Sequence, residues 1–178
     1  LAIEIKKHLD LINLRSCFIK KDYQNQIDEQ KLLESYAATI IRNSRLDALC
    51  EAKKKGYQIA IFDDGLQDNT IDYDISFACF NKKNLIGNGR IIPAGPLRES
   101  LKKLQKYENV FMIGNQENIK NDFLKNSSSL NFFEAIYDPL NLDQFKKDEN
   151  FIVFSGIGNH KTFIDMLINH QINIIKDL

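Results

Sequence analysis

Residues 57–67 read Tyr-Gln-Ile-Ala-Ile-Phe-Asp-Asp-Gly-Leu-Gln. The apolar run at 57–62 is typical of a short buried strand, and two carboxylates, Asp63 and Asp64, follow it directly before Gly65. In an open α/β sheet, ligands bind at the carboxyl ends of the strands, and Mg²⁺ prefers oxygen ligands of this kind. The stretch therefore allows two interpretations: a metal-binding strand end, or a strand that runs into a polar Asp-Gly turn.

Apolar runs alternate with amphipathic helical patterns along the whole chain, which predicts an α/β protein with a parallel sheet. Strands are expected at 16–19, 38–41, 57–62, 74–80, 109–113, 131–137, 151–154 and 172–178. Helices are expected at 1–9, 28–34, 44–55 and after 159, a polar loop at 20–26, and linkers at 125–130 and 138–150. In the helix at 44–55, Leu46, Leu49 and Ala52 should form the apolar face, and Gly56 should end the helix.

The composition is that of an ordinary soluble globular protein, with 178 residues, 43% hydrophobic and 27% charged. Lys+Arg and Asp+Glu both number 24, so no overall field attracts nucleic acid, and no apolar run reaches the length of a membrane span. The cysteines and histidines lack metal-ligand spacing, and they are Cys17, Cys50, Cys79, His8, His160 and His170. We expect buried thiols in a reducing compartment, and histidines on the surface or in helix caps.

A second informative stretch reads Gly-Asn-Gly-Arg-Ile-Ile-Pro-Ala-Gly-Pro-Leu-Arg-Glu at 87–99. Its glycines and prolines predict a fixed irregular loop that lets backbone approach a ligand closely. Pro96 suits the first residue of a helix, which would put Arg98 in the first turn, where free N–H groups and the helix dipole favour an anion. Two interpretations remain: Arg98 clamps a phosphate, or it pairs with Glu99 or solvent in a rigid connector.

Two weaker patterns have plainer explanations. The Gly-x-Gly at 156–158 follows a strand, but the third glycine and the ribose-binding acid of a dinucleotide loop are absent. We therefore expect a tight turn with Asn159 as the helix cap. Basic residues follow one side of the stretch after Pro96, at Arg98, Lys102, Lys103 and Lys106. They indicate a solvated surface or a contact with an anionic phospholipid.

Four segments occur in a distinctive order: Asp63-Asp64-Gly65-Leu66-Gln67, Gly87-Asn88-Gly89, Pro93-Ala94-Gly95-Pro96-Leu97-Arg98-Glu99 and Gly156-Ile157-Gly158-Asn159. Together they resemble the tetraacyldisaccharide 4'-kinase family, the lipid A kinases of Gram-negative bacteria, over essentially the whole chain. The resemblance implies a P-loop NTPase-like fold, a mostly parallel sheet flanked by helices, truncated at both ends. Residues 1–148 would be a partial P-loop kinase core without its Walker A loop, which would precede Leu1, and 149–178 would start the C-terminal α/β portion.

The activity that the resemblance implies is ATP-dependent phosphorylation of the 4'-hydroxyl of tetraacyldisaccharide 1-phosphate, with ATP and Mg²⁺ as cofactors. The implied partners are this acylated glucosamine disaccharide and the anionic inner membrane, at whose cytoplasmic face the enzyme would work in a Gram-negative bacterium. The chain itself should be inactive, because the P-loop lysine lies outside it. The alternatives are another P-loop kinase or ligase with a soluble acceptor, resembling dethiobiotin synthetase, and a non-catalytic nucleotide-binding module.

The resemblance also assigns roles to individual residues. Asp63 and Asp64 match the Walker B acidic pair, which serves Mg²⁺ and contacts to the ATP phosphates. Asp28 matches an aspartate implicated in activating the sugar hydroxyl, and it stands beside Glu29. From the residues alone, Asp28 would be the cap or first turn of a solvated helix.

Three further matches complete the assigned site. Arg98 and Glu99 match an active-site pair near the phosphates, and Gln67, like Glu29, would contribute to substrate or phosphate binding. The chain departs from the family pattern at Asp68, where the family usually has His. It also departs at 19–23, where Ile-Lys-Lys-Asp-Tyr replaces a Ser-Arg-Gly-Tyr-like stretch.

Overall fold

The structure is a computed structural model that describes residues 1–23, 26–114, 130–146, 148–157 and 159–178. The chain divides into two compact units, Leu1–Ser76 and Phe77–Leu178. Both contain parallel strands accompanied by helices, so the predicted α/β class is confirmed. The expected division into a kinase core at 1–148 and a further portion from 149 stays a prediction.

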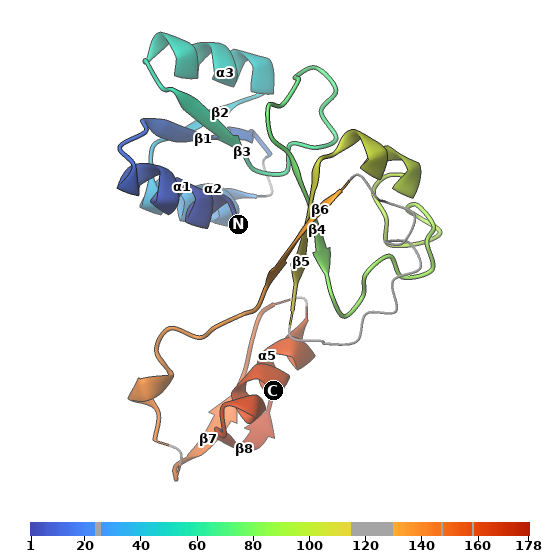
Figure 1. Cartoon of the computed structure of the whole chain (residues 1–178). Coiled ribbons are helices and arrows are strands. Elements are labelled where there is room, and N and C mark those ends of the chain that lie inside the picture. The colour runs from blue at the N-terminus through green and yellow to red at the C-terminus, as the bar shows by residue number, and fades with distance from the viewer. Residues whose placement is uncertain (24–25, 115–129, 147, 158) are drawn as a thin grey trace. The chain divides into compact units, whose positions relative to one another are not determined.

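The first unit is built on a three-stranded parallel sheet in the order β2-β1-β3. Its strands are β1 (Ser16–Lys21), β2 (Thr39–Arg42) and β3 (Ile59–Phe62). Its helices are α1 (Ala2–Leu11), α2 (Ile27–Tyr36) and α3 (Arg45–Lys54). Helices α1 and α2 cover one face of the sheet and α3 covers the other (Figure 1). The central strand β1 is consequently buried almost throughout, as parallel strands usually are.

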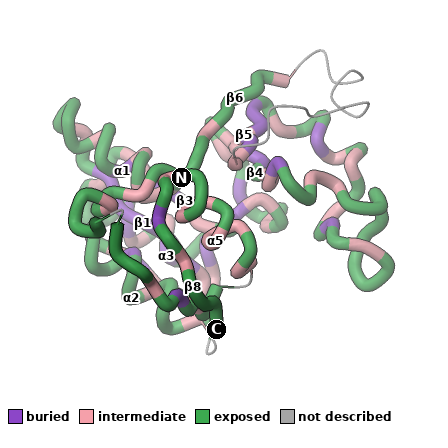
Figure 2. The backbone as a smooth tube through the Cα atoms, turned by 90° about the horizontal axis from the view of Figure 1, so that it is seen from below, coloured by how far each residue is buried: buried purple, intermediate pink, exposed green. Residues whose placement is uncertain are grey.

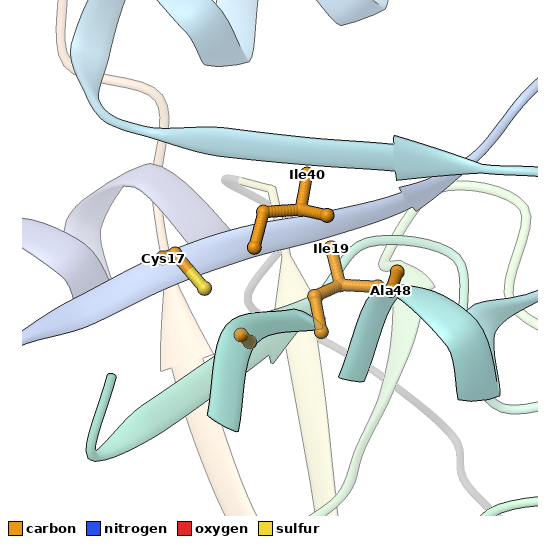
Figure 3. Close-up of a cluster of buried hydrophobic side chains, with 5 residues drawn as sticks. Cys17, Ile19, Ile40 and Ala48 are labelled. Carbon is orange, nitrogen blue, oxygen red and sulfur yellow. The ribbon is translucent and has the colours of Figure 1, made fainter. Parts of the chain in front are cut away.

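Successive residues of β1 point into two different cores, because side chains alternate across a strand. Cys17 and Ile19 pack with Ile40 and with the α3 residues Ala48 and Ala52 (Figure 3). On the opposite face, Phe18 packs with Leu33 of α2 and Ile61 of β3, and apolar residues of α1 close this cluster. Fully burying a large aliphatic or aromatic side chain contributes about 1.5–3 kcal/mol. Both cores therefore fix the sheet and leave its carboxyl edge to polar residues.

Helix α3 begins and ends as expected, and of its predicted apolar face Leu49 and Ala52 pack against the core whereas Leu46 does not. Ser44 is its N-cap and accepts a hydrogen bond from the Asp47 amide, and Gly56 follows its end with a positive φ of 74°. The prediction that Leu46 lies on the apolar face is wrong, since Leu46 is 48% exposed. The buried residues of the helix are Arg45, Ala48 and Ala52. Arg45 joins this stripe because its guanidinium has partners beyond the end of β3.

The second unit contains a three-stranded parallel sheet and a separate parallel strand pair. The sheet has the order β4-β5-β6, with β4 (Phe77–Asn81), β5 (Asn109–Ile113) and β6 (Asn131–Ala135). The pair consists of β7 (Asn150–Val153) and β8 (Asn173–Asp177), joined through α5 (His160–Asn169). Two short 3₁₀ helices are η1 (Leu101–Lys106) and η2 (Leu142–Gln144). Figure 2 shows that buried positions gather in strands such as β1 and β5.

Several sequence-based boundaries and burial predictions change. Strand β1 continues through Lys21, so the polar loop expected from residue 20 starts later. Of the three thiols only Cys17 is buried, and burial raises its pKa to about 11; the burial expected for Cys50 and Cys79 is wrong, because both are exposed. The expected cap is confirmed, since the Asn159 side chain accepts a hydrogen bond from the Thr162 amide. Residues 125–129 of one expected linker, and residue 158, lie outside the described part of the chain.

Candidate functional site

Asp63 is the first residue after β3, at the carboxyl edge of the first unit's parallel sheet. Its amide donates to the Ile19 carbonyl of β1 at 3.4 Å, so the sheet itself holds the backbone of the strand end. The Asp63 side chain is 38% exposed. Asp64 is exposed and takes a left-handed φ of 57°, which turns the chain sharply away from the strand direction.

One buried lysine connects Asp63 to the start of α2. Lys20 Nζ donates to Asp63 Oδ2 at 3.0 Å and to Glu29 Oε2 at 2.5 Å, while the lysine side chain is only 2% exposed. Burial lowers the pKa of Lys20, but the hydrogen bonds to Glu29 and then Asp63 outweigh it, so the pKa stands above its usual value. Lys20 is therefore a charged ammonium beneath two carboxylates.

A hollow of about 150 Å³ opens above this ion cluster. Its lining residues are Leu1, Ala2, Ile3, Glu29, Leu32, Leu33 and Asp63. The amino end of α1 forms one wall. The positive end of a ten-residue helix favours an anion, whereas the carboxylates favour a cation. The hollow therefore suits a ligand that carries both, such as a phosphate with its metal ion.

The segment after Asp63 is tied down by a buried arginine. Arg45 Nη2 donates to the Asp64 carbonyl at 2.8 Å, and Nη1 lies 3.4 Å from Asp68 Oδ2. The Thr70 hydroxyl and amide both donate to Asp68 Oδ1, at 2.5 and 3.0 Å. The Thr70 hydroxyl, then its amide, and then Arg45 hold the pKa of Asp68 below its usual value against a small effect of burial. Asp68, which stands where the family usually has His, thus has a structural role here.

The remaining first-unit candidates lie near this edge. Asp28 and Glu29 occupy the first turn of α2, both are exposed, and the expectation of a solvated first turn for Asp28 is confirmed. Gln67 is exposed in the turn that follows β3. Within this unit, Lys20 brings Glu29 and Asp63 together and so places the turn carrying Asp28 beside the strand end.

The loop at 87–99 in the second unit is closed by its own contacts. Asn88 Nδ2 donates to the Ala94 carbonyl at 2.8 Å, and the Arg90 amide donates to Asn88 Oδ1 at 3.1 Å. A Cβ on Gly95 would collide with Asn88 Oδ1 and the Arg90 carbonyl oxygen. The prediction of a fixed irregular loop is confirmed, and at Gly95 the glycine is required by the loop's own packing.

The expected helix start at Pro96 is wrong, and with it the placement of Arg98 in a first helical turn. The Leu97 amide donates to Arg90 and the Leu97 carbonyl accepts from Ile92, which keeps the chain in a bridge. Helix η1 begins only after Ser100, so Arg98 is exposed in the bend before it. The helix-dipole argument for an anion at Arg98 therefore does not apply.

Glu99 joins this bend to η1. Its carboxylate accepts from Lys103 Nζ at 2.5 Å and from the Tyr107 hydroxyl at 2.8 Å. The bond from Lys103 lowers the pKa of Glu99, partial burial opposes the shift, and Tyr107 adds to it. The partners of Glu99 thus make it a brace for the loop.

Sequence reasoning missed Lys20 and Arg45, two buried cations beside the end of β3. The sequence predicts a polar loop from residue 20 to residue 26, which puts Lys20 outside the strand. A signal was nevertheless present, since the strand of Lys20 runs parallel to the one that ends at the acidic pair, and an isolated buried acid or base needs a partner.

The donor set at Asp63 fits a hard divalent cation. Mg²⁺ typically binds one or two carboxylates of the kind that a rigid strand end provides. Water and phosphate oxygens complete its coordination shell. Among the residues that the structure describes, no group of three or more His, Cys, Asp and Glu side chains could hold a metal ion alone. A cation bound here would therefore take its other ligands from water or from a phosphate.

These features define an α/β protein with a hollow lined by two carboxylates at the carboxyl edge of a parallel sheet. The chain belongs to the Tetraacyldisaccharide-1-P 4'-kinase family, whose model matches residues 18–178. This confirms the family resemblance found in the sequence.

Individual relatives carry the name Tetraacyldisaccharide 4'-kinase. The protein of Pelagibacter ubique is 52% identical over 181 residues, which cover all of this chain and 58% of the relative. The protein of Rickettsia typhi is 29% identical over 168 residues, which cover 92% of this chain and 51% of the relative. That of Colwellia psychrerythraea is 33% identical over 142 residues, which cover 73% of this chain and 41% of the relative. The chain thus spans about half the length of the curated relatives it matches. No solved structure matched it. No helix in the described part of the chain is both long and apolar enough to cross a membrane.

Proposed function

We propose that this chain is part of an ATP- and Mg²⁺-dependent kinase that phosphorylates the 4'-hydroxyl of tetraacyldisaccharide 1-phosphate. Family membership supports this reaction, and one structural observation carries it. The Asp63 carboxylate and the amino end of α1 line the same hollow. That arrangement suits a P-loop NTPase-like fold in which α1 follows the phosphate-binding loop and Asp63 belongs to the Walker B pair.

Phosphoryl transfer requires mainly positioning and charge neutralisation from the protein. Mg²⁺ would supply positive charge at the β- and γ-phosphates, and Asp63 and Asp64 would hold it. Asp28 accepts the proton of the sugar's 4'-hydroxyl. As it does so, the hydroxyl oxygen bonds to the γ-phosphorus of ATP, the bond from that phosphorus to the β–γ bridging oxygen breaks, and ADP leaves. Arg98 donates to the charge that develops on the transferred group.

The same proposal covers the residues around this centre. Glu29 and Gln67 contribute to substrate or phosphate binding, and Glu99 does so by holding the bend that carries Arg98. The basic residues Lys102 and Lys106 of η1 are exposed. We assign them to contact with an anionic membrane surface, and we propose the cytoplasmic face of the inner membrane of a Gram-negative bacterium as that surface.

A chimera tests this function directly. The matching segment of the Pelagibacter ubique relative is replaced by residues 1–178, and transfer of labelled γ-phosphate to the acylated disaccharide is measured with Mg-ATP. The chimera should transfer phosphate at a rate comparable to that of the unmodified relative, and chelation of Mg²⁺ should stop the reaction. A chimera with native circular dichroism that leaves the lipid unlabelled, while the unmodified relative labels it, would refute the proposal.

A further inference from the structure

Lys20 is an unusual residue for the centre of a parallel sheet. It lies on the middle strand β1, its side chain is 2% exposed, and its face of the sheet is the one that α1 and α2 cover. Its ammonium bonds to Asp63 and Glu29, and both of these carboxylates line the hollow. The buried ammonium of Lys20 thus bonds to both carboxylates, and a ligand can reach the same two carboxylates from the hollow.

We propose that Lys20 is a resident cation that stands in for a divalent ion between Asp63 and Glu29, so that metal binds here well only together with nucleotide phosphates. This inference deepens the proposed function and rests on Asp63 as a metal carboxylate.

The first step of the argument concerns charge. An ammonium buried this deeply requires partners, and two carboxylates this close together would otherwise repel each other. The single positive charge of Lys20 offsets part of the two negative charges of Asp63 and Glu29. The two acids therefore attract a free divalent cation less strongly than they would without Lys20. An ammonium a few ångströms from a bound divalent ion repels it substantially, even at the effective dielectric constant of a protein surface.

The second step concerns coordination. Asp63 Oδ2 already accepts a hydrogen bond from Lys20, and no described cluster of acidic, His or Cys side chains completes a metal shell. A metal that arrives on a nucleotide brings phosphate oxygens and water, so it needs little more than one contact with Asp63. A bare ion lacks those ligands and meets the ammonium instead. The site therefore discriminates in favour of the metal–nucleotide complex.

Three variants of the chain separate charge from structure. Lys20→Met keeps the length of the side chain and removes its charge, whereas Lys20→Arg keeps the charge. Lys21→Met is the matched control, because Lys21 is the next residue of β1 and its ammonium lies over the Tyr23 ring, 5.7 Å from the centroid. Glu29 and Asp63 are 57% and 38% exposed, so both can turn to water when Lys20 is lost and Lys20→Met should fold.

The probe is MnCl₂ alone, without nucleotide, followed by electron paramagnetic resonance of the free ion. Lys20→Met should bind Mn²⁺ at least roughly tenfold more tightly than the unmodified chain, as the Coulomb repulsion lost predicts. Lys20→Arg and Lys21→Met should bind as weakly as the unmodified chain. Equal affinity of Lys20→Met and the unmodified chain, or equally tight binding by Lys20→Arg, would overturn the inference.

A second measurement applies if the Lys20→Met variant does not fold without added metal. MgCl₂ should then restore its helical circular dichroism, and NaCl of the same ionic strength should not, because only a divalent ion can replace the ammonium between the acids. Absence of this rescue would also overturn the inference. The outcome is separate from that of the chimera, since no phosphate transfer is involved in either measurement.

Discussion

Asp68 shows how one residue can keep a motif position while taking a different role. It follows the acidic pair at a position where the family usually has His, and Thr70 and Arg45 bind its carboxylate. Arg45 also donates to the Asp64 carbonyl, so Asp68 indirectly fixes the turn that follows Asp63. Sequence alone identified Asp68 as a departure from the pattern. Its partner Arg45 was not among the predicted site residues, because a charged residue in the first turn of a helix is usually solvated.

The lowered pKa of Asp68 predicts a pH dependence of stability. Because the folded-state pKa lies below the unfolded value, the stabilisation is present above the unfolded pKa and is lost as the pH falls through the folded pKa. Asp68→Asn should remove this part of the acid dependence. In urea unfolding at several pH values below 5, we expect the free-energy difference between the unmodified chain and Asp68→Asn to shrink with acidification. A difference that stays constant would show that the Asp68 charge contributes nothing.

Asp63 is the residue whose loss should affect chemistry most. In the chimera, Asp63→Asn should lower phosphate transfer by about a hundredfold or more, because a carboxylate that holds the metal at the phosphates cannot be replaced by an amide. The melting temperature should change little, since Asp63 is partly exposed and Lys20 keeps Glu29. Asp72→Asn is the matched control, an exposed acid from the same connection. Equal activity of both variants would remove Asp63 from the site.

At the scale of elements, local sequence patterns predicted which helices and strands form far better than where each one ends and which face it buries. All eight predicted strands correspond to strands of the structure, because each is a short apolar run bounded by polar residues. The failures arise where a specific backbone pairing decides. Strand β1 continues to Lys21 because β2 pairs with it there, and η1 starts late because Leu97 is bound to Arg90. The β2 partner lies outside the window that a local pattern examines, and hydropathy periodicity does not register a backbone hydrogen bond such as the one between Leu97 and Arg90.

The loop at 87–99 offers a test of the claim that its glycines serve its own packing. Gly95→Ala should destabilise the second unit by about 2 kcal/mol or more, because its Cβ would meet the Arg90 backbone, which cannot move aside like a flexible side chain. Gly156→Ala is the matched control, since no atom lies within 4 Å of its Cβ position. Thermal unfolding followed by calorimetry should show a lower midpoint for Gly95→Ala only. Equal midpoints would mean that the loop opens at little cost.

At the scale of the whole molecule, the assigned residues are divided between the two units. Asp28, Glu29, Asp63, Asp64 and Gln67 belong to the first, whereas Arg98 and Glu99 belong to the second. The first unit thus holds the residues proposed to bind the metal and to activate the acceptor hydroxyl. The second unit holds Arg98, the cation proposed to stabilise the charge that develops on the transferred phosphate. The family resemblance predicted this set as one site. The proposed transfer reaction thus draws on residues of both units.

The polypeptide of residues 1–178 should bind Mg-ATP weakly. Its hollow offers the amino end of α1 and the Asp63 carboxylate, but the sequence contains no glycine-rich Walker A loop with its lysine. In P-loop proteins the backbone N–H groups of that loop and the lysine cradle the phosphates. Isothermal titration of this polypeptide with Mg-ATP should therefore give much weaker binding than the same titration of the chimera, in which the relative supplies the rest of its own chain. Lys20→Met adds a charge control, because removing the ammonium should strengthen Mn²⁺ binding without creating the missing phosphate contacts. Submicromolar binding of Mg-ATP by residues 1–178 alone would contradict both the assignment of α1 to the helix after the loop and the need for that loop.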